Sequence, residues 1–188
     1  MKNEDTRERL IDATVRLLTE GQDAEGITAR QICAEAQTNL AMINYFFKSK
    51  EKLMHLAVER IMASDAQRLI GAEVSGLTPR QQLRGMLIAL CEDAVAYHKY
   101  ARISVPFILL QEEITIPLTL LPLLRGHFNG AKSEEECRII AYEMTSFFQL
   151  VLLRAEDFVK YSGMDVFNTA QRARLVDMQL DLFLGKET

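Results

Sequence analysis

Residues 26–50 read GITARQICAEAQTNLAMINYFFKSK, and this stretch decides the fold. Thr28 and Gln31 form a capping-box pattern, which predicts the start of a short helix. A turn at residues 37–39 follows, and Asn39 is a favourable N-cap for a second short helix. Ser49 is a candidate N-cap for a longer helix. Two short helices joined by a tight turn are the layout of a helix-turn-helix, whose second helix enters the major groove of DNA.

The second short helix has to bury one face and expose the other. Ile43 and Phe47 are four residues apart and are predicted to face the core. Asn44 can pair bidentately with adenine through its amide, although it can also simply cap the end of a short helix. Ala41 is small enough for the helix backbone to approach the bases. The side chains predicted to contact DNA are Thr28, Arg30, Asn39, Leu40, Ala41, Met42, Asn44, Tyr45, Lys48 and Lys50.

Phosphate contacts are assigned to three of these residues. The hydroxyl of Tyr45 sits on a long rigid stem that suits a phosphate oxygen. Lys50 lies at the predicted start of a helix, where its ammonium and the helix dipole both favour an anion. Thr28 offers its hydroxyl in the same way. The alternatives are a half-buried aromatic for Tyr45 and solvated surface positions for the lysines.

Composition limits the classes of protein that the chain can be. Its 188 residues suffice for one large or two small domains, and a hydrophobic fraction of 48% with 26% charged residues is typical of a globular protein. The formal net charge of −4 is unlike that of many nucleic-acid binders. Residues 26–50 nevertheless carry three basic residues against one acidic residue, a local net charge of +2.

Several kinds of site are not indicated. The three cysteines are far apart without CxxC spacing, which argues against a zinc site or a disulfide framework and favours a reduced, cytoplasmic setting. The histidines lack ligand spacing, so no metal or cofactor is expected, and no catalytic motif indicates an enzyme. The charged N-terminus does not resemble a signal peptide. The apolar region 103–124 is interrupted by charges and prolines, which favours buried helices over a membrane span.

Helical periodicity extends along nearly the whole chain, which predicts an all-α fold of about nine helices. A first helix carries one apolar stripe, formed by Leu10, Ile11, Thr14, Leu17 and Leu18. Further helices are predicted at 51–70, 79–97, 133–160 and 165–184, with two short helices within 103–128 broken before Pro117. The predicted domains are a helix-turn-helix domain at 1–50, linked through the helix at 51–70, and a helical bundle at 71–188.

From Thr6 to about Leu56 the sequence resembles the N-terminal domain of the TetR family of transcriptional regulators. The residues that carry the resemblance are TRERLIDATVRLL, ITARQICAEA and the specific segment NLAMINYFFKSKEKL. Two positions depart from the family pattern. Gln37 stands in the turn where Gly is usual, so it must tolerate the backbone angle that the turn requires. Asn44 stands where Tyr is frequent, so the base preference of known members is not carried over.

The resemblance implies an all-helical C-terminal domain that dimerises through its last two long helices and holds a ligand. The implied effector is small and mostly apolar, and the residues expected to contact it are Met86, Leu90, Cys91, Ala94, Tyr97, Phe107, Leu110, Tyr142 and Phe147. The residues expected at the dimer interface are Phe148, Val151, Leu152, Ala155, Ala173, Val176, Leu180 and Phe183.

The sequence as a whole predicts a homodimeric repressor that the effector releases from a palindromic operator. Two other functions stay open from the sequence. One is a redox-sensing regulator that acts through Cys33 or Cys91. The other is a helical binding protein without a DNA function.

Overall fold

The computed structural model describes residues 2–20, 26–66 and 76–186, and every regular element among them is helical. The all-α prediction is therefore confirmed for this part of the chain. The chain divides into two compact units, Met1–Gly71 with Lys99–Gln111 and Ala72–His98 with Glu112–Thr188. Each unit is described by itself below.

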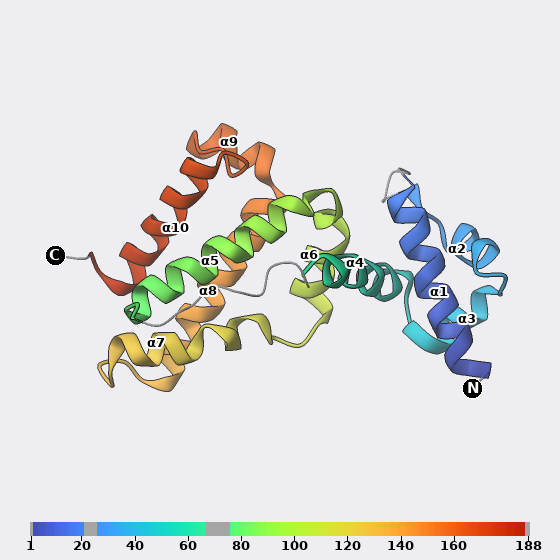
Figure 1. The fold of residues 1–188 in the computed structure, drawn as a ribbon, viewed down its shortest axis with the longest axis horizontal. Coiled ribbons are helices and arrows are strands. Elements are labelled where there is room, and N and C mark those ends of the chain that lie inside the picture. Colours follow the sequence, from blue (N-terminus) through green and yellow to red (C-terminus); the bar gives the residue numbers. More distant parts are fainter. Residues whose placement is uncertain (1, 21–25, 67–75, 187–188) are drawn as a thin grey trace. The chain divides into compact units, whose positions relative to one another are not determined.

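The first unit is built around the first helix, α1 (Lys2–Thr19). Against α1 pack α2 (Ala29–Glu35), α3 (Leu40–Phe47) and α4 (Lys50–Ala66), as Figure 1 shows. A fifth helix, α6 (Ala101–Gln111), comes from much later in the sequence and packs on α4. The predicted stripe of α1 is buried throughout, from Leu10 to Leu18.

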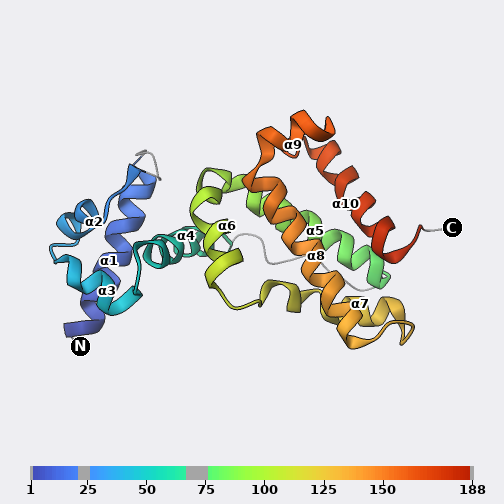
Figure 2. The same ribbon diagram turned by 180° about the vertical axis from the view of Figure 1, so that it is seen from behind.

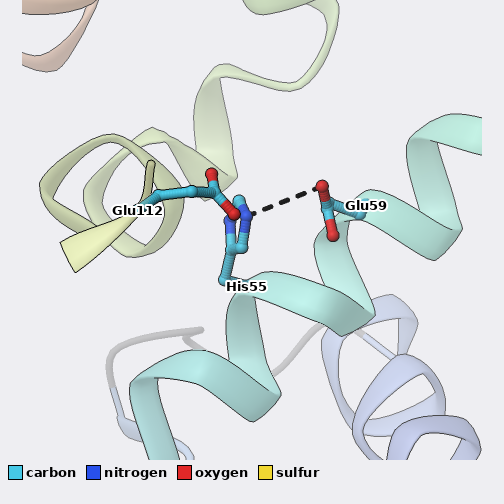
Figure 3. A group of neighbouring side chains, drawn as sticks. All are labelled: His55, Glu59 and Glu112. Carbon is cyan, nitrogen blue, oxygen red and sulfur yellow. Dashed lines mark ion pairs between the residues drawn. The ribbon is translucent and has the colours of Figure 1, made fainter. Parts of the chain in front are cut away.

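Aromatic contacts join α6 to the rest of the first unit. The ring of Phe107 stacks on the buried ring of His55 in α4, with 4.8 Å between ring centroids. His55 also places its Nε2 atom 3.7 Å from a carboxylate oxygen of Glu59, one helical turn along α4 (Figure 3). The hydroxyl of Tyr100, in the short 3-10 helix His98–Tyr100 before α6, donates a hydrogen bond of 3.3 Å to the carbonyl of Leu18.

The second unit is a bundle whose helices surround α5 (Pro79–Ala96). Figure 2 shows α5 beside α8 (Glu134–Leu153) and α10 (Thr169–Leu184), and it also contacts α7 (Leu121–Phe128). A 3-10 helix (Ile116–Thr119) and α9 (Ala155–Ser162) complete the unit. Its core is a single cluster of buried side chains, which includes Leu83, Leu124, Met144 and Val176.

Helix boundaries differ from the prediction in two places. The first difference divides one predicted helix, so the described residues hold ten α-helices instead of about nine. The single helix expected at 133–160 is two helices, because the backbone leaves the helical region at Arg154 (φ −118°, ψ 34°). The last helix begins at Thr169 instead of 165, because the side chain of Asn168 caps it by accepting from the N–H of Gln171 at 3.1 Å. The predicted end of α4 near residue 70 lies outside the described residues.

Candidate nucleic-acid interface

The start of α2 is fixed by the predicted capping box. The Thr28 hydroxyl accepts from the Gln31 N–H at 3.3 Å, and the Gln31 side chain accepts from the Thr28 N–H at 2.8 Å. The Thr28 hydroxyl also donates to the same Gln31 oxygen at 2.7 Å. The N–H and the hydroxyl of Thr28 therefore both take part in the cap of α2.

The turn between α2 and α3 is a Schellman motif. The N–H of Thr38 donates to the carbonyl of Cys33 at 2.9 Å, and the N–H of Gln37 donates to the carbonyl of Ala34 at 3.2 Å. The motif requires a left-handed residue between helix and loop, and Gln37 adopts it with a φ of 51°. The expectation that Gln37 must accept an angle suited to Gly is therefore met in the structure.

The inner face of α3 is formed by Ile43 and Phe47, which are both buried as predicted. The guanidinium of Arg7 on α1 lies over the Phe47 ring, 5.6 Å from its centroid. Asn39 has the extended backbone of an N-cap, but its side chain makes no capping hydrogen bond. The start of α3 therefore has no side-chain cap, and the buried contacts of the helix lie further along it.

The outer face of α3 is exposed along its whole length. It is formed by Leu40, Ala41, Asn44, Tyr45 and Lys48, with Met42 half-buried beside them. Tyr45 is 58% exposed, and its ring meets that of Phe46 edge-on with 4.8 Å between centroids. This edge contact directs the phenol outward, so its hydroxyl is available to a phosphate.

Lys50, which the sequence assigns to a phosphate, makes a hydrogen bond within its own chain. Its ammonium donates to the carbonyl of Ile27 at 2.9 Å, which ties the start of α4 to the residue before α2. The side chain is half-buried, whereas Lys48 and Arg30 are exposed. Of the basic residues predicted to contact DNA, Lys48 and Arg30 are therefore the exposed ones.

Ion pairs connect α1 to the helices on either side of α3. Arg60 of α4 donates to Glu8 at 2.6 Å and to Asp12 at 2.9 Å, both on α1. The hydrogen bond from Arg60 lowers the pKa of the Glu8 carboxyl, and the same bond raises the pKa of Arg60. Arg16 of α1 pairs with Glu35 of α2 at 2.8 Å. These contacts fix the helices between which α3 is presented.

The residues predicted to contact an effector are divided between the two units. Met86, Cys91 and Phe147 belong to the core cluster of the second unit or pack against it, and Ala94 and Tyr97 are half-buried. Leu90 and Tyr142 are exposed. Phe107 and Leu110 belong to the first unit, where Phe107 packs on His55 and Leu110 is 79% exposed. The sequence pattern could not separate these positions, because each of them lies on an apolar helix.

The residues predicted at a dimer interface lie in the core of their own chain. Five are buried in the core cluster of the second unit, namely Phe148, Val151, Ala155, Val176 and Leu180. Leu152 and Phe183 pack against that cluster, and Ala173 is half-buried. The apolar side chains that α8 and α10 expose are others, namely Ile139, Tyr142, Leu150, Met178 and Leu182. An interface on these two helices would therefore have these exposed side chains available, together with the partly buried Leu152, Ala173 and Phe183.

The three cysteines are buried and unpaired. Burial raises the pKa of Cys33 and of Cys137, and it raises the pKa of Cys91 to about 12. The thiolate is the reactive form of cysteine, so these thiols are in their unreactive state at neutral pH. This disfavours redox sensing through Cys33 or Cys91. In the part of the chain that the structure describes, no helix is long and apolar enough to span a bilayer.

These observations define the class: an all-α protein in which a helix-turn-helix is followed by a helical bundle. A crystal structure of a TetR-like transcriptional regulator from Rhodococcus sp. RHA1 matches 96% of this chain and 97% of its own, with a TM-score of 0.53 and 18% sequence identity. The chain therefore has the TetR-like fold, as the resemblance in its sequence implies.

Other comparisons are weaker. HlyIIR, in the form of an alanine-substituted mutant, matches over 97% of both chains with 17% identity, but its TM-score of 0.38 is too low to support an argument. The HTH-type transcriptional regulator PksA of Bacillus subtilis (strain 168) is 25% identical over 88 residues. That match spans 47% of this chain and 42% of PksA. No model of a protein family matches the chain.

Proposed function

We propose that this chain is a DNA-binding transcriptional regulator whose helix α3 reads the major groove. The observation that carries the proposal is the exposed outer face of α3, held between α2 and α4 by the capping box, the Schellman turn and the bond from Lys50 to Ile27. The fold that it shares with a TetR-like regulator supports the same function.

We assign the exposed side chains two roles, base recognition and contact with phosphates. Asn44 reads adenine with its amide, because it lies at the centre of the exposed face. Tyr45, Lys48 and Arg30 contact phosphates, because each is exposed and carries a hydroxyl or a positive charge. Asn39, at the start of α3, has an amide that no cap occupies and can also reach the backbone of DNA.

The regulator acts as a homodimer on a palindromic operator, since two-fold symmetry places two copies of α3 on two half-sites about one helical turn apart. The exposed apolar stripes of α8 and α10 support the dimer, because large apolar side chains there lie outside the chain's own core. We propose repression in the cytoplasm, relieved by a small and mostly apolar effector that binds the second unit. The support for such a ligand is the resemblance that the sequence bears to the TetR family.

The dimer is tested by sedimentation of the purified protein at micromolar concentration. The variant Leu182→Glu places a charge on a side chain that is 73% exposed, so the fold is retained while the dimer dissociates. Leu118→Glu, at an exposed leucine outside α8 and α10, is the matched control and leaves the dimer intact. A wild-type protein that stays monomeric would contradict the proposal.

DNA binding is tested by selecting bound duplexes from a random pool at physiological salt. We expect enrichment of a palindrome. Tyr45→Ala weakens binding to all sequences, whereas Asn44→Ala relaxes the preference at one position of each half-site by about 1–3 kcal/mol. Affinity equal to wild type for both variants would contradict the assigned roles, and absence of any enriched sequence would contradict DNA recognition itself.

A further inference from the structure

After the N-cap Asn39, the first three residues of α3 have side chains made of hydrocarbon or a thioether, with no hydrogen-bond donor. Leu40 is 45% exposed, Ala41 is exposed and Met42 is half-buried. The side chains that fix this helix in the core are others, Ile43 and Phe47. Leu40 and Ala41 therefore form an apolar surface on the part of α3 that is proposed to face DNA.

In a helix-turn-helix the N-terminal residues of the second helix are those that meet the base edges. Leu40, Ala41 and Met42 have no donor or acceptor for those edges. The commonest contact to guanine needs an Arg or Lys. The first basic residue in α3 or at its end is Lys48, the C-cap at the opposite end of the helix. The first turn is therefore unable to read guanine by hydrogen bonds.

One apolar group is available in the major groove, the C5-methyl group of thymine. We infer that Leu40 and Ala41 read thymine methyl groups, so that the recognised DNA is a half-site with thymines opposite the first turn of α3. Asn44 lies four residues after Leu40 and three after Ala41, on the same helical face. The apolar contact and the adenine contact thus fall side by side, and together they select adjacent A·T pairs.

This inference rests on the proposed function. Its test distinguishes failure of the methyl contact from failure of DNA recognition itself. The probe is the duplex enriched by selection, in which thymines are replaced by uracil one position at a time. Uracil keeps the base pairing and removes only the methyl group. Affinity is measured by fluorescence anisotropy at fixed salt, because phosphate contacts depend on ionic strength.

We expect wild-type protein to lose about fourfold in affinity for each buried methyl group that is removed. The loss occurs at one or two positions of each half-site and not elsewhere. Leu40→Ala binds the thymine duplex more weakly and no longer distinguishes uracil at its position. Leu118→Ala, which changes a leucine of nearly equal exposure (44%) in the second unit, distinguishes uracil as the wild type does.

Two results would overturn the inference while DNA recognition stands. One is specific binding that no uracil substitution weakens. The other is a uracil effect that Leu40→Ala and Ala41→Gly both leave unchanged, since the methyl group is then read by a different part of the protein. A pool that yields no enriched sequence overturns the proposed function and the methyl contact together.

Discussion

Replacing Gln37 with glycine should stabilise the first unit. Gln37 adopts a φ of 51° in the Schellman turn, and its side chain is exposed. For a residue with a Cβ atom this left-handed conformation costs about 1–2 kcal/mol. Glycine removes that cost but loses about 0.4–1 kcal/mol through the greater freedom of the unfolded chain. The net expectation is a gain in the free energy of unfolding of about 0.8 kcal/mol, within a range of about 0–1.6 kcal/mol.

The most direct assay is hydrogen exchange at the amide of Thr38, which donates to the carbonyl of Cys33 at 2.9 Å across the turn. A gain of about 1 kcal/mol corresponds to exchange that is about fivefold slower. Thermal unfolding gives a second measurement, with a shift of about 2–4 °C per kcal/mol for a protein of this size.

Gln37→Ala is the control for this experiment. Alanine keeps a Cβ atom at the same backbone angle, so the variant is expected to match the wild type within experimental error. If Gln37→Gly proves no more stable than Gln37→Ala, backbone strain in the turn is not what limits the stability of the helix-turn-helix, and the reasoning is refuted.

Three further predictions concern the charged side chains around α3. A plot of the logarithm of affinity against the logarithm of salt concentration has a negative slope. Lys48→Met should make that slope shallower by about 1, because an exposed phosphate contact is lost. Lys50→Met should leave that slope unchanged and lower the free energy of unfolding by about 1 kcal/mol, because its bond to Ile27 is lost. Arg60→Met should cost about 1 kcal/mol at neutral pH. The folded pKa of Glu8 is lowered, so stabilisation by this pair is present above the ordinary value of 4.5 and is lost as pH falls through the folded pKa. The difference in stability between wild type and Arg60→Met should therefore shrink in acid, and a constant difference across pH 2–7 would contradict the assignment.

Local patterns in the sequence predicted local features of the structure. The capping box at Thr28 is formed, and the stripe of α1 is buried. Each of these depends on side chains three or four residues apart. The hydrogen bond that Lys50 donates to Ile27 could not be predicted in this way, because the carbonyl lies 23 residues earlier in the sequence. The packing of Phe107 on His55 is likewise a contact between distant parts of the sequence.

The residues predicted at the dimer interface show a second limit of prediction from sequence periodicity. Helix α8 is apolar nearly all round between Phe147 and Leu153, so periodicity indicates that it is buried without indicating against what. The structure distinguishes two adjacent residues of this stretch. Val151 is in the core of its own chain, whereas its neighbour Leu150 is exposed.

Three exceptions to the usual rules of local stability fall within four residues at the start of α3. Gln37 has a left-handed backbone, Asn39 makes no side-chain cap, and Leu40 is exposed. Such exceptions are expected where function competes with folding. The substitutions Gln37→Gly and Leu40→Ala distinguish an effect on folding from an effect on DNA binding. Gln37→Gly should raise stability and leave DNA affinity unchanged, because the Gln37 side chain is not assigned a base or phosphate. Leu40→Ala should leave stability nearly unchanged and weaken binding, because its exposed side chain contributes to recognition and not to the core.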